Sequence, residues 1–303
     1  MPWLSLVILC TLLVSACGSL NSAATGSGGS QSLATINVVA AENFYGDIVR
    51  QLGGSHVKVT NILSNPNIDP HVFESNPQTS FAIEKANFVI ENGLGYDTWM
   101  DQLLSASQNT NRVVLVAGKI ADHTLPDNPH VWYGFDNMPT IATAITNALK
   151  KLDRAHASLF DSNLATFKQS LVPLQQKIRQ INAKYAGTPV TLTETIYLYQ
   201  SLPEGLNVLT PFGFEKAIAE GNDPTADTVI ATNNELSDHK AKILIYNEQT
   251  ITPITTHLEN EAKKLNIPVV PVYETEPSHK TYQQWMMAQL NVLQQALATA
   301  TGK

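Results

Sequence analysis

The stretch that decides the fold is LFDSNLATFKQSLVPLQQKIRQINAKY, residues 159–185, near the middle of the chain. Its large apolar side chains recur at alternating intervals of four and three residues: Phe160, Leu164, Phe167, Leu171, Leu174, Ile178 and Ile181. This spacing places one apolar stripe along a helix of about 25 residues, roughly 38 Å long at 1.5 Å per residue. Pro173 lies inside the stretch and lacks a backbone N–H, so we expect it to kink the helix.

Two arrangements account for such a helix. It is either a backbone shared by two lobes or one helix of a coiled-coil dimer, and its stripe covers barely three heptads. The short repeat favours the first arrangement. We therefore predict that residues 159–185 form a linker helix between two lobes of a monomeric chain.

Apolar, β-branched runs on both sides of this helix predict strands that alternate with helices. The strand-like runs are 35–40, 57–63, 86–91, 112–117, 189–193, 242–246 and 268–273, and the expected helices are 42–52, 138–152, 253–265 and 282–297. Strands that are apolar almost throughout are typical of parallel sheets covered on both faces. The sequence thus predicts an α/β fold of two doubly wound parallel-sheet lobes, residues 35–158 and 186–303, joined by the linker helix.

The composition is that of an acidic chain with a large core. Of 303 residues, 43% are hydrophobic and 15% are charged, and 19 Lys and Arg against 26 Asp and Glu give a formal net charge of −7. A nucleic-acid-binding protein needs a basic face to displace counterions from phosphates, so nucleic acid is not an expected partner. The sequence also has no Gly-rich phosphate loop, no G-x-S-x-G elbow and no H-E-x-x-H motif. We therefore do not expect an enzyme.

The N-terminus predicts a membrane anchor. Residues 3–14 form an apolar run that is too short for a bilayer, which needs about 20 residues, but suits a signal-peptide core. The following VSACG, residues 14–18, resembles a bacterial lipobox, in which the cysteine is lipidated and becomes the new N-terminus. We predict a signal peptide at 1–16, a lipid on Cys17 and a flexible tether at 17–34, which together anchor an extracytoplasmic protein to the bacterial cell membrane. A buried N-terminal strand or helix is the alternative.

Four side chains spread over both lobes predict a metal site. His71 and His130 each lie in a loop between a proline and a valine, with an aromatic residue next. Glu194 and Glu274 each directly follow a predicted strand. Because open α/β sheets bind ligands beyond the carboxyl ends of their strands, both glutamates are expected to face one crevice. Two imidazoles and two carboxylates form a mixed N/O set that suits zinc or manganese, whereas solvated loop histidines are the alternative.

Several motifs, in this order, carry a family resemblance. They are AENFYGD at 41–47, DPH at 69–71, NGLGYD at 92–97 with Trp99, NPHVW at 128–132, the stretch 191–199 and ETEP at 274–277. With them the body of the chain, about Ile36 to Leu297, resembles the zinc/manganese-type solute-binding lipoproteins of ABC importers, the cluster A-I or cluster 9 metal-binding family. The resemblance implies two α/β lobes joined by one long helix. It also implies that the protein carries a divalent metal ion, Zn2+ or Mn2+, to a membrane permease.

The resemblance further implies one metal ligand in each quarter of the chain: His71, His130, Glu194 and Glu274. Glu276 is the alternative to Glu274 at the fourth position. In the family, glutamate at the third position accompanies manganese sites, and the His-rich loop of many zinc members is missing here, with only His123 near His130. The Irving–Williams order favours zinc over manganese in such a set, so the sequence leaves both metals open.

Two further functions compete with metal delivery. A surface adhesion lipoprotein with a structural metal would unfold on chelation, whereas a transport protein stays folded without its ion. A metallohydrolase needs an open coordination position and a general base, for which four protein ligands leave little room. The other histidines are expected at the surface: His56, His156, His239, His257 and His279.

Overall fold

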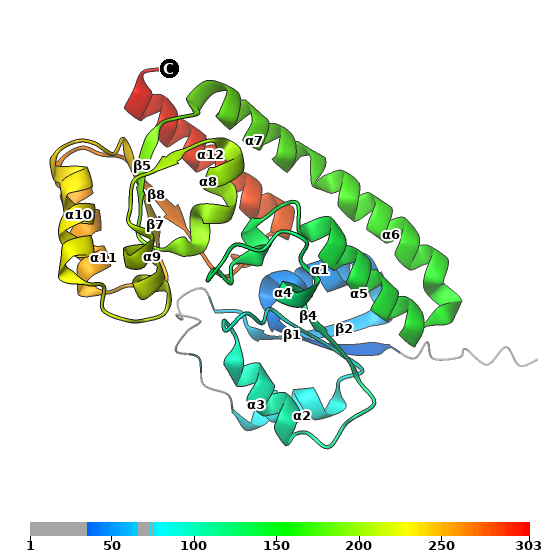
Figure 1. Cartoon of the computed structure of the whole chain (residues 1–303). Coiled ribbons are helices and arrows are strands. Elements are labelled where there is room, and N and C mark those ends of the chain that lie inside the picture. Colours follow the sequence, from blue (N-terminus) through cyan, green and yellow to red (C-terminus); the bar gives the residue numbers. More distant parts are fainter. Residues whose placement is uncertain (1–34, 66–72, 74–75) are drawn as a thin grey trace, which may run out of the picture. The chain divides into compact units, whose positions relative to one another are not determined.

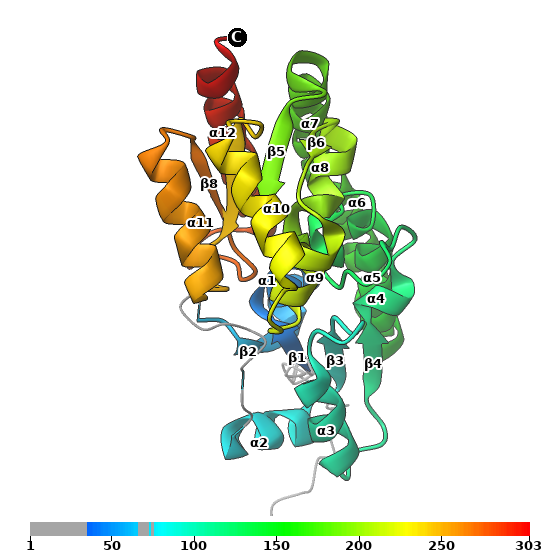
Figure 2. The same ribbon diagram turned by 60° about the vertical axis from the view of Figure 1, so that its left-hand side comes forward.

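A computed structural model describes residues 35–65, residue 73 and residues 76–303. Within this range the chain forms two four-stranded parallel sheets, one in each half of the sequence (Figure 1, Figure 2). The predicted signal peptide, Cys17, the tether and His71 lie outside the described residues. No helix in the described part of the chain has both the length and the apolar character needed to cross a membrane.

The N-terminal sheet has the strand order β2-β1-β3-β4, and every neighbouring pair is parallel. Its half of the chain contains β1 (Ile36–Glu42), α1 (Asn43–Gly53), the 3-10 turn η1 (Gly54–His56), β2 (Val57–Leu63), α2 (Pro77–Lys85), β3 (Phe88–Glu91), α3 (Thr98–Ala106), β4 (Val113–Val116), α4 (Ala117–Ile120), η3 (Val131–Tyr133), α5 (Met138–Leu152) and η4 (Arg154–His156). Because the strands are parallel, all their carboxyl ends lie at one edge of the sheet.

Helices cover both faces of this sheet, which is why its central strands are apolar almost throughout. Val39 and Val89 belong to a cluster with side chains of α2 and α3. Val38 and Phe88 belong to a second cluster with side chains of α1 and α5. The sheet is therefore doubly wound, as the sequence predicts.

The C-terminal sheet repeats this plan with the order β6-β5-β7-β8. Its half contains β5 (Pro189–Leu192), η5 (Thr195–Tyr197), α8 (Leu198–Glu204), β6 (Asn207–Val208), α9 (Phe212–Ala219), α10 (Ala226–Ser237), β7 (Ile243–Asn247), α11 (Pro253–Lys264), β8 (Val269–Val272) and α12 (Tyr282–Thr301). Side chains of α9, α10 and α11 pack on one face, and those of α7, α8 and α12 on the other. The strand β6 has no counterpart among the predicted runs because two residues are too short to show a period.

Two helices, α6 (Ala157–Ser170) and α7 (Val172–Tyr185), take the place of the single predicted linker helix. Only Leu171 separates them, and Figure 1 shows them running nearly in line. Pro173 lies in the first turn of α7, where a missing N–H costs least. The proline therefore interrupts the helix, while Phe160, Phe167 and Leu174 of the apolar stripe are all buried.

The C-terminal helix α12 connects the two halves of the described chain. The backbone N–H of Tyr282, in its first turn, donates to Asp47 Oδ2 of α1 at 2.9 Å. Next to this contact, the Phe44 ring lies 4.7 Å from the Trp132 ring and 6.0 Å from the Trp285 ring of α12, measured between centroids. We call Phe44, Trp132 and Trp285 the aromatic bridge. It belongs to one apolar core that continues from one sheet to the other.

Candidate metal centre

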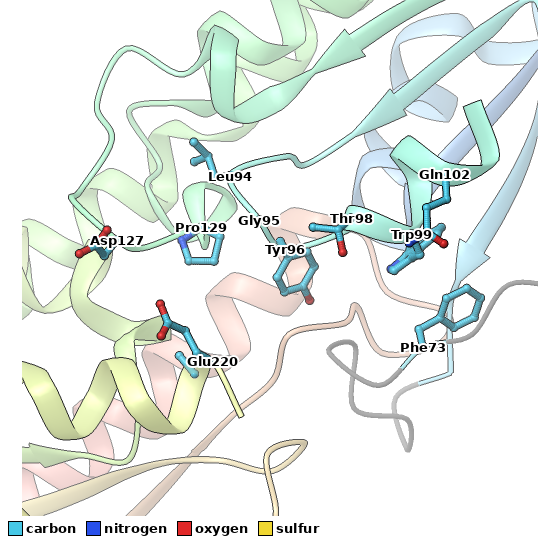
Figure 3. A pocket seen from close by; sticks show the side chains of 11 residues that line it. Phe73, Leu94, Gly95, Tyr96, Thr98, Trp99, Gln102, Asp127, Pro129 and Glu220 are labelled. Atoms are coloured by element: carbon cyan, nitrogen blue, oxygen red, sulfur yellow. The ribbon is translucent and has the colours of Figure 1, made fainter. Parts of the chain in front are cut away.

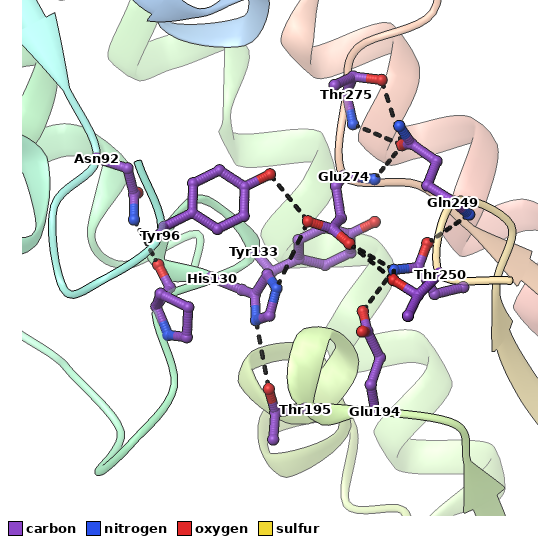
Figure 4. Close-up of polar contacts among 12 residues, drawn as sticks. Asn92, Tyr96, His130, Tyr133, Glu194, Thr195, Gln249, Thr250, Glu274 and Thr275 are labelled. Carbon is purple, nitrogen blue, oxygen red and sulfur yellow. Dashed lines mark hydrogen bonds and ion pairs between the residues drawn. The ribbon is translucent and has the colours of Figure 1, made fainter. Parts of the chain in front are cut away.

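Three of the four predicted ligands meet between the two sheets (Figure 4). One ligand atom each from His130, Glu194 and Glu274 lies within 4.8 Å of the others, and all three residues are buried. We call these three residues the cage. The fourth predicted ligand, His71, lies outside the described residues, so its place beside the cage stays a prediction.

The ends of the strands position the two glutamates. Glu194 lies two residues beyond β5 and directly precedes the turn η5, and Glu274 lies two residues beyond β8. His130 comes from the other half of the chain, immediately before the turn η3. The cage therefore lies beyond the carboxyl ends of the C-terminal strands, in the crevice where open α/β sheets bind ligands.

Asn128 sets the orientation and the tautomer of His130. The Asn128 Nδ2 amide donates to the Thr195 carbonyl oxygen at 2.7 Å, which leaves Oδ1 as the acceptor. This Oδ1 lies 2.8 Å from His130 Nδ1, so Nδ1 carries the proton. The other ring nitrogen, Nε2, then presents its lone pair toward the Glu274 carboxylate, 3.9 Å from Oε2. A histidine whose Nδ1 is held in this way is arranged to bind a cation through Nε2.

Asn247 joins the two carboxylates, although no motif in the sequence points to it. It is the last residue of β7, and its Nδ2 lies 2.5 Å from Glu194 Oε1 and 2.6 Å from Glu274 Oε1. The Thr250 hydroxyl also donates to Glu274 Oε1, at 3.3 Å. These donors satisfy the two buried carboxyl groups and hold them side by side. The only available signal for Asn247 is its place at the end of a strand between β5 and β8.

Tyr96 brings the N-terminal half of the chain into contact with Glu274. Its hydroxyl donates to Glu274 Oε2 at 2.9 Å, and its ring lies edge-on to His130 with centroids 5.9 Å apart. Burial, followed by the nearby charges of Glu274 and Glu42, raises the pKa of Tyr96 well above its usual range. The hydroxyl therefore stays protonated and keeps donating. The NGLGYD motif contains Tyr96 but does not reveal this role.

Of the two carboxylates considered for the fourth position, Glu274 lies in the cage. Glu276 is held apart from it by Asn43, which accepts from the Glu276 backbone N–H at 3.0 Å and donates to its carbonyl oxygen at 2.7 Å. Burial, and to a smaller extent the charge of Asp47, raise the pKa of Glu276 to about 9. A carboxyl group that is protonated at neutral pH is a poor metal ligand. The geometry favours Glu274, and the charge state of Glu276 speaks against Glu276.

A cavity of about 700 Å³ lies beside the cage (Figure 3). Tyr96 and Pro129, which neighbour the cage residues, line it together with side chains from both halves of the chain. Asp127 and Glu220 lie near one another at one end of this cavity, and Lys216 pairs with Asp127 at 2.9 Å and with Glu220 at 3.7 Å. Ion pairs this exposed contribute only about 0–1 kcal/mol, so they do not lock the two sides together.

The remaining histidines fall into two classes. His239, His257 and His279 are exposed, in agreement with the expectation. For His56 the expectation is wrong, because this residue is only 8% exposed and packs edge-on against Phe160 with ring centroids 5.9 Å apart. Together with Asp153 and His156 it forms a second group of potential ligand atoms within 4.8 Å of one another.

Similarities to known proteins extend over most of the chain. Residues 38–296 match the family described as zinc-uptake complex component A, periplasmic. The manganese-binding lipoprotein MntA of Bacillus subtilis is 25% identical over 181 residues, which are 57% of each chain. The metal ABC transporter substrate-binding lipoprotein ScbA of Streptococcus cristatus is 22% identical over 235 residues, 73% of this chain and 74% of that one. The chain thus spans just over half the length of MntA in this match.

A solved structure shares the fold. The periplasmic zinc-binding protein TroA from Treponema pallidum superimposes with a TM-score of 0.75 over 87% of this chain and 99% of that chain. The two sequences are 15% identical, so the likeness concerns the fold alone. It confirms the predicted α/β architecture of two parallel-sheet lobes.

Proposed function

This chain belongs to the zinc-uptake complex component A family, and on that premise we propose that it captures a divalent transition metal ion, zinc or manganese, between two lobes and delivers it to the membrane permease of an ABC importer. The observation that carries this proposal is the cage, which brings one imidazole and two carboxylates, all buried, together from both halves of the chain. Burying two neighbouring carboxylates is costly, and a bound cation offsets that cost.

The ligand set in this proposal consists of the cage and His71. Two neutral imidazoles and two carboxylates carry a formal charge of −2, and a mixed N/O set suits zinc and manganese. The names of the similar proteins divide between the same two metals, since MntA is named manganese-binding and TroA zinc-binding. We assign no catalytic residue, because four protein ligands leave little room for a substrate on the metal.

The proposal includes the location of the protein and its division into lobes. Residues 1–16 act as a removed signal peptide, Cys17 carries the lipid, and residues 17–34 tether an extracytoplasmic monomer to the membrane. The VSACG motif supports the lipid, and MntA and ScbA are both named lipoproteins. Residues 35–158 and 186–303 are the two lobes, and residues 159–185 are the linker.

Metal titration tests the proposed site directly. We expect one equivalent of zinc or manganese to bind at the cage, and we expect Glu194→Ala to abolish this binding. His71→Ala should lower the affinity at least about tenfold, since loss of a partner outside the ligand set already lowers metal affinity by about 10–100-fold. His239→Ala is the matched control, because His239 is exposed and lies outside the cage. Unchanged binding in Glu194→Ala would contradict the proposal.

Thermal unfolding separates delivery from a structural role in adhesion. After chelation, a transport protein should remain folded and melt at a lower temperature, and added metal should raise the melting temperature by mass action. A protein whose metal is structural should lose its cooperative transition. The shift that is lost in Glu194→Ala, measured with zinc and with manganese at equal concentration, identifies the ion that the cage prefers.

A further inference from the structure

A second group of metal-ligand side chains lies outside the cage. His56, Asp153 and His156 each offer a ligand atom within 4.8 Å of the other two. Both imidazoles approach the same carboxylate oxygen: Asp153 Oδ2 lies 2.7 Å from His156 Nδ1 and 3.6 Å from His56 Nδ1. The two rings lie beside one another, with centroids 3.8 Å apart and a tilt of 36°. We call these three residues the triad.

Three turns of the N-terminal half bring the triad together. His56 ends η1 and directly precedes β2, Asp153 follows the last residue of α5, and His156 ends η4 and directly precedes α6. His56 therefore lies at the amino end of β2, whereas the strand ends that face the crevice are carboxyl ends. The seven residues of β2 alone span about 23 Å at 3.3 Å per residue. The triad is thus a separate site from the cage.

The spacing of the triad fits a tetrahedral ion. Zinc bonds of about 2.0–2.1 Å to histidine nitrogen and carboxylate oxygen place neighbouring ligand atoms about 3.3 Å apart. The two distances to Asp153 Oδ2, 2.7 and 3.6 Å, lie on either side of this value. Movements of a few tenths of an ångström, well within the reach of side-chain rotation, would bring both histidines to bonding distance.

The exposed fraction of the side chain increases from His56 to Asp153 to His156, which suits a site with three protein ligands and one water. The side chain of His56 is 9% exposed, that of Asp153 is 15% exposed and that of His156 is 28% exposed. The inner ligands are therefore held by packing, while the side of His156 is open to solvent. An ion can enter from that side, and a water molecule can complete its coordination.

We propose that His56, Asp153 and His156 form a second divalent-metal site, selective for zinc over manganese, with solvent as the fourth ligand. Two nitrogens and one oxygen suit zinc, while manganese favours sites dominated by carboxylate, carbonyl and water oxygens. An ion there would connect the start of β2 to the junction of α5 and α6, where the chain leaves the N-terminal sheet for the linker (Figure 1). The bound ion would thus hold the start of the linker, at α6, against the N-terminal sheet.

Zinc titration of the full chain, by calorimetry and by competition with a chromophoric chelator, tests the triad. We expect two zinc equivalents in the wild type. His156→Ala should weaken the binding of one zinc ion at least about tenfold and leave the affinity for the other unchanged. Loss of a partner that only hydrogen-bonds to a ligand already weakens metal affinity by about 10–100-fold, and loss of a direct ligand should weaken it at least as much. Glu194→Ala should retain the triad equivalent, and His257→Ala, an exposed histidine outside both groups, should retain both. A wild type with no zinc beyond the cage, or a His156→Ala variant that keeps both equivalents, overturns the proposal.

A second measurement covers the case in which His156→Ala does not fold. In wild-type protein, zinc should shift the imidazole nitrogen resonances of His56 and His156 together, and manganese at the same concentration should leave them at their metal-free positions. Asp153→Asn, which keeps the shape but removes the charge, should weaken this zinc response at least about tenfold. Resonances that do not respond to zinc in the wild type overturn the proposal, as does an equal response in Asp153→Asn.

Discussion

Replacing Asn128 by alanine should weaken metal binding although Asn128 is not a ligand. Its Oδ1 accepts from His130 Nδ1 at 2.8 Å and from the His130 backbone N–H at 3.1 Å, and its Nδ2 donates to the Thr195 carbonyl. The side chain is only 3% exposed, so water does not readily replace it. Alanine removes the acceptor that keeps the proton on Nδ1, and the ring loses its preference for presenting Nε2 to an ion.

The size of the effect follows from these contacts. An imidazole N–H that is buried without its acceptor costs about 1–3 kcal/mol. At 1.4 kcal/mol for each factor of ten, the dissociation constant of the metal should rise about 5- to 150-fold. Thr195 Oγ1 lies 3.4 Å from His130 Nδ1 and offers a weaker substitute acceptor, which favours the lower half of this range.

Competition against a chelator of known affinity measures this dissociation constant, and chemical denaturation of the chelated protein measures the free energy of unfolding. Asn128→Asp is the informative control. It keeps the acceptor for Nδ1 but loses the amide that donates to the Thr195 carbonyl at 2.7 Å. We therefore expect both variants to lose stability, while only the alanine variant loses metal affinity.

Two results would refute this reasoning. One is an Asn128→Ala protein whose metal affinity stays within twofold of the wild type, which would mean that His130 does not need its partner. The other is an equal loss of affinity in Asn128→Ala and Asn128→Asp. Affinity would then follow general stability and not the tautomer of His130.

Three further changes have expected outcomes. Glu274→Gln should weaken metal binding at least about tenfold, whereas Glu276→Gln, whose parent carboxyl has a pKa of about 9, should bind as the wild type in the same titration. Burial and the charges of Asp97 and Asp101 raise the pKa of Glu91 to about 7. The folded protein therefore keeps a proton that the unfolded chain releases near pH 4.5, so the free energy of unfolding should fall as the pH rises from 4.5 to 7. Glu91→Gln should remove up to about 1.4 kcal/mol per pH unit of that slope in denaturation curves, and an unchanged slope would contradict the shift. Leu174→Ala, in the buried stripe, should lower the free energy of unfolding by about 2–5 kcal/mol, and an equal loss in the 61%-exposed control Leu202→Ala would be evidence against the stripe as core.

The fold could be predicted where the sequence repeats a single physical requirement. The 4-3 stripe of residues 159–185 has one helical solution, and β2 and α5 have the bounds that their apolar runs predict. The break at Leu171 follows from Pro173. Helices such as α2 and α9 are short and weakly periodic, so their positions depend on the sheets that they cover and not on their own residues.

The candidate site could be predicted only in part. Glu194 and Glu274 are found by the rule that strand ends face the crevice, and His130 by its motif, although 64 and 80 residues separate these three positions. Asn247 has no such signal, because an asparagine at a strand end is common in any chain, and the NPHVW motif contains Asn128 without revealing its role. Their roles exist only after folding has placed their amides within hydrogen-bond distance of the cage.

The two halves of the chain are joined by polar contacts on one side of the cage and by an apolar core on the other. This difference determines which side would open to release an ion. On one side of the cage, polar contacts such as Tyr96 to Glu274, Asn128 to the Thr195 carbonyl and Lys216 to Asp127 join the halves. A hydrogen bond of this kind contributes about 0.5–1.5 kcal/mol, and the exposed ion pair contributes less. On the other side lies the aromatic bridge, within a continuous apolar core whose separation would expose several large rings to water. We therefore expect the crevice to open on the side of the polar contacts first, with the aromatic bridge and α12 as the region that stays closed.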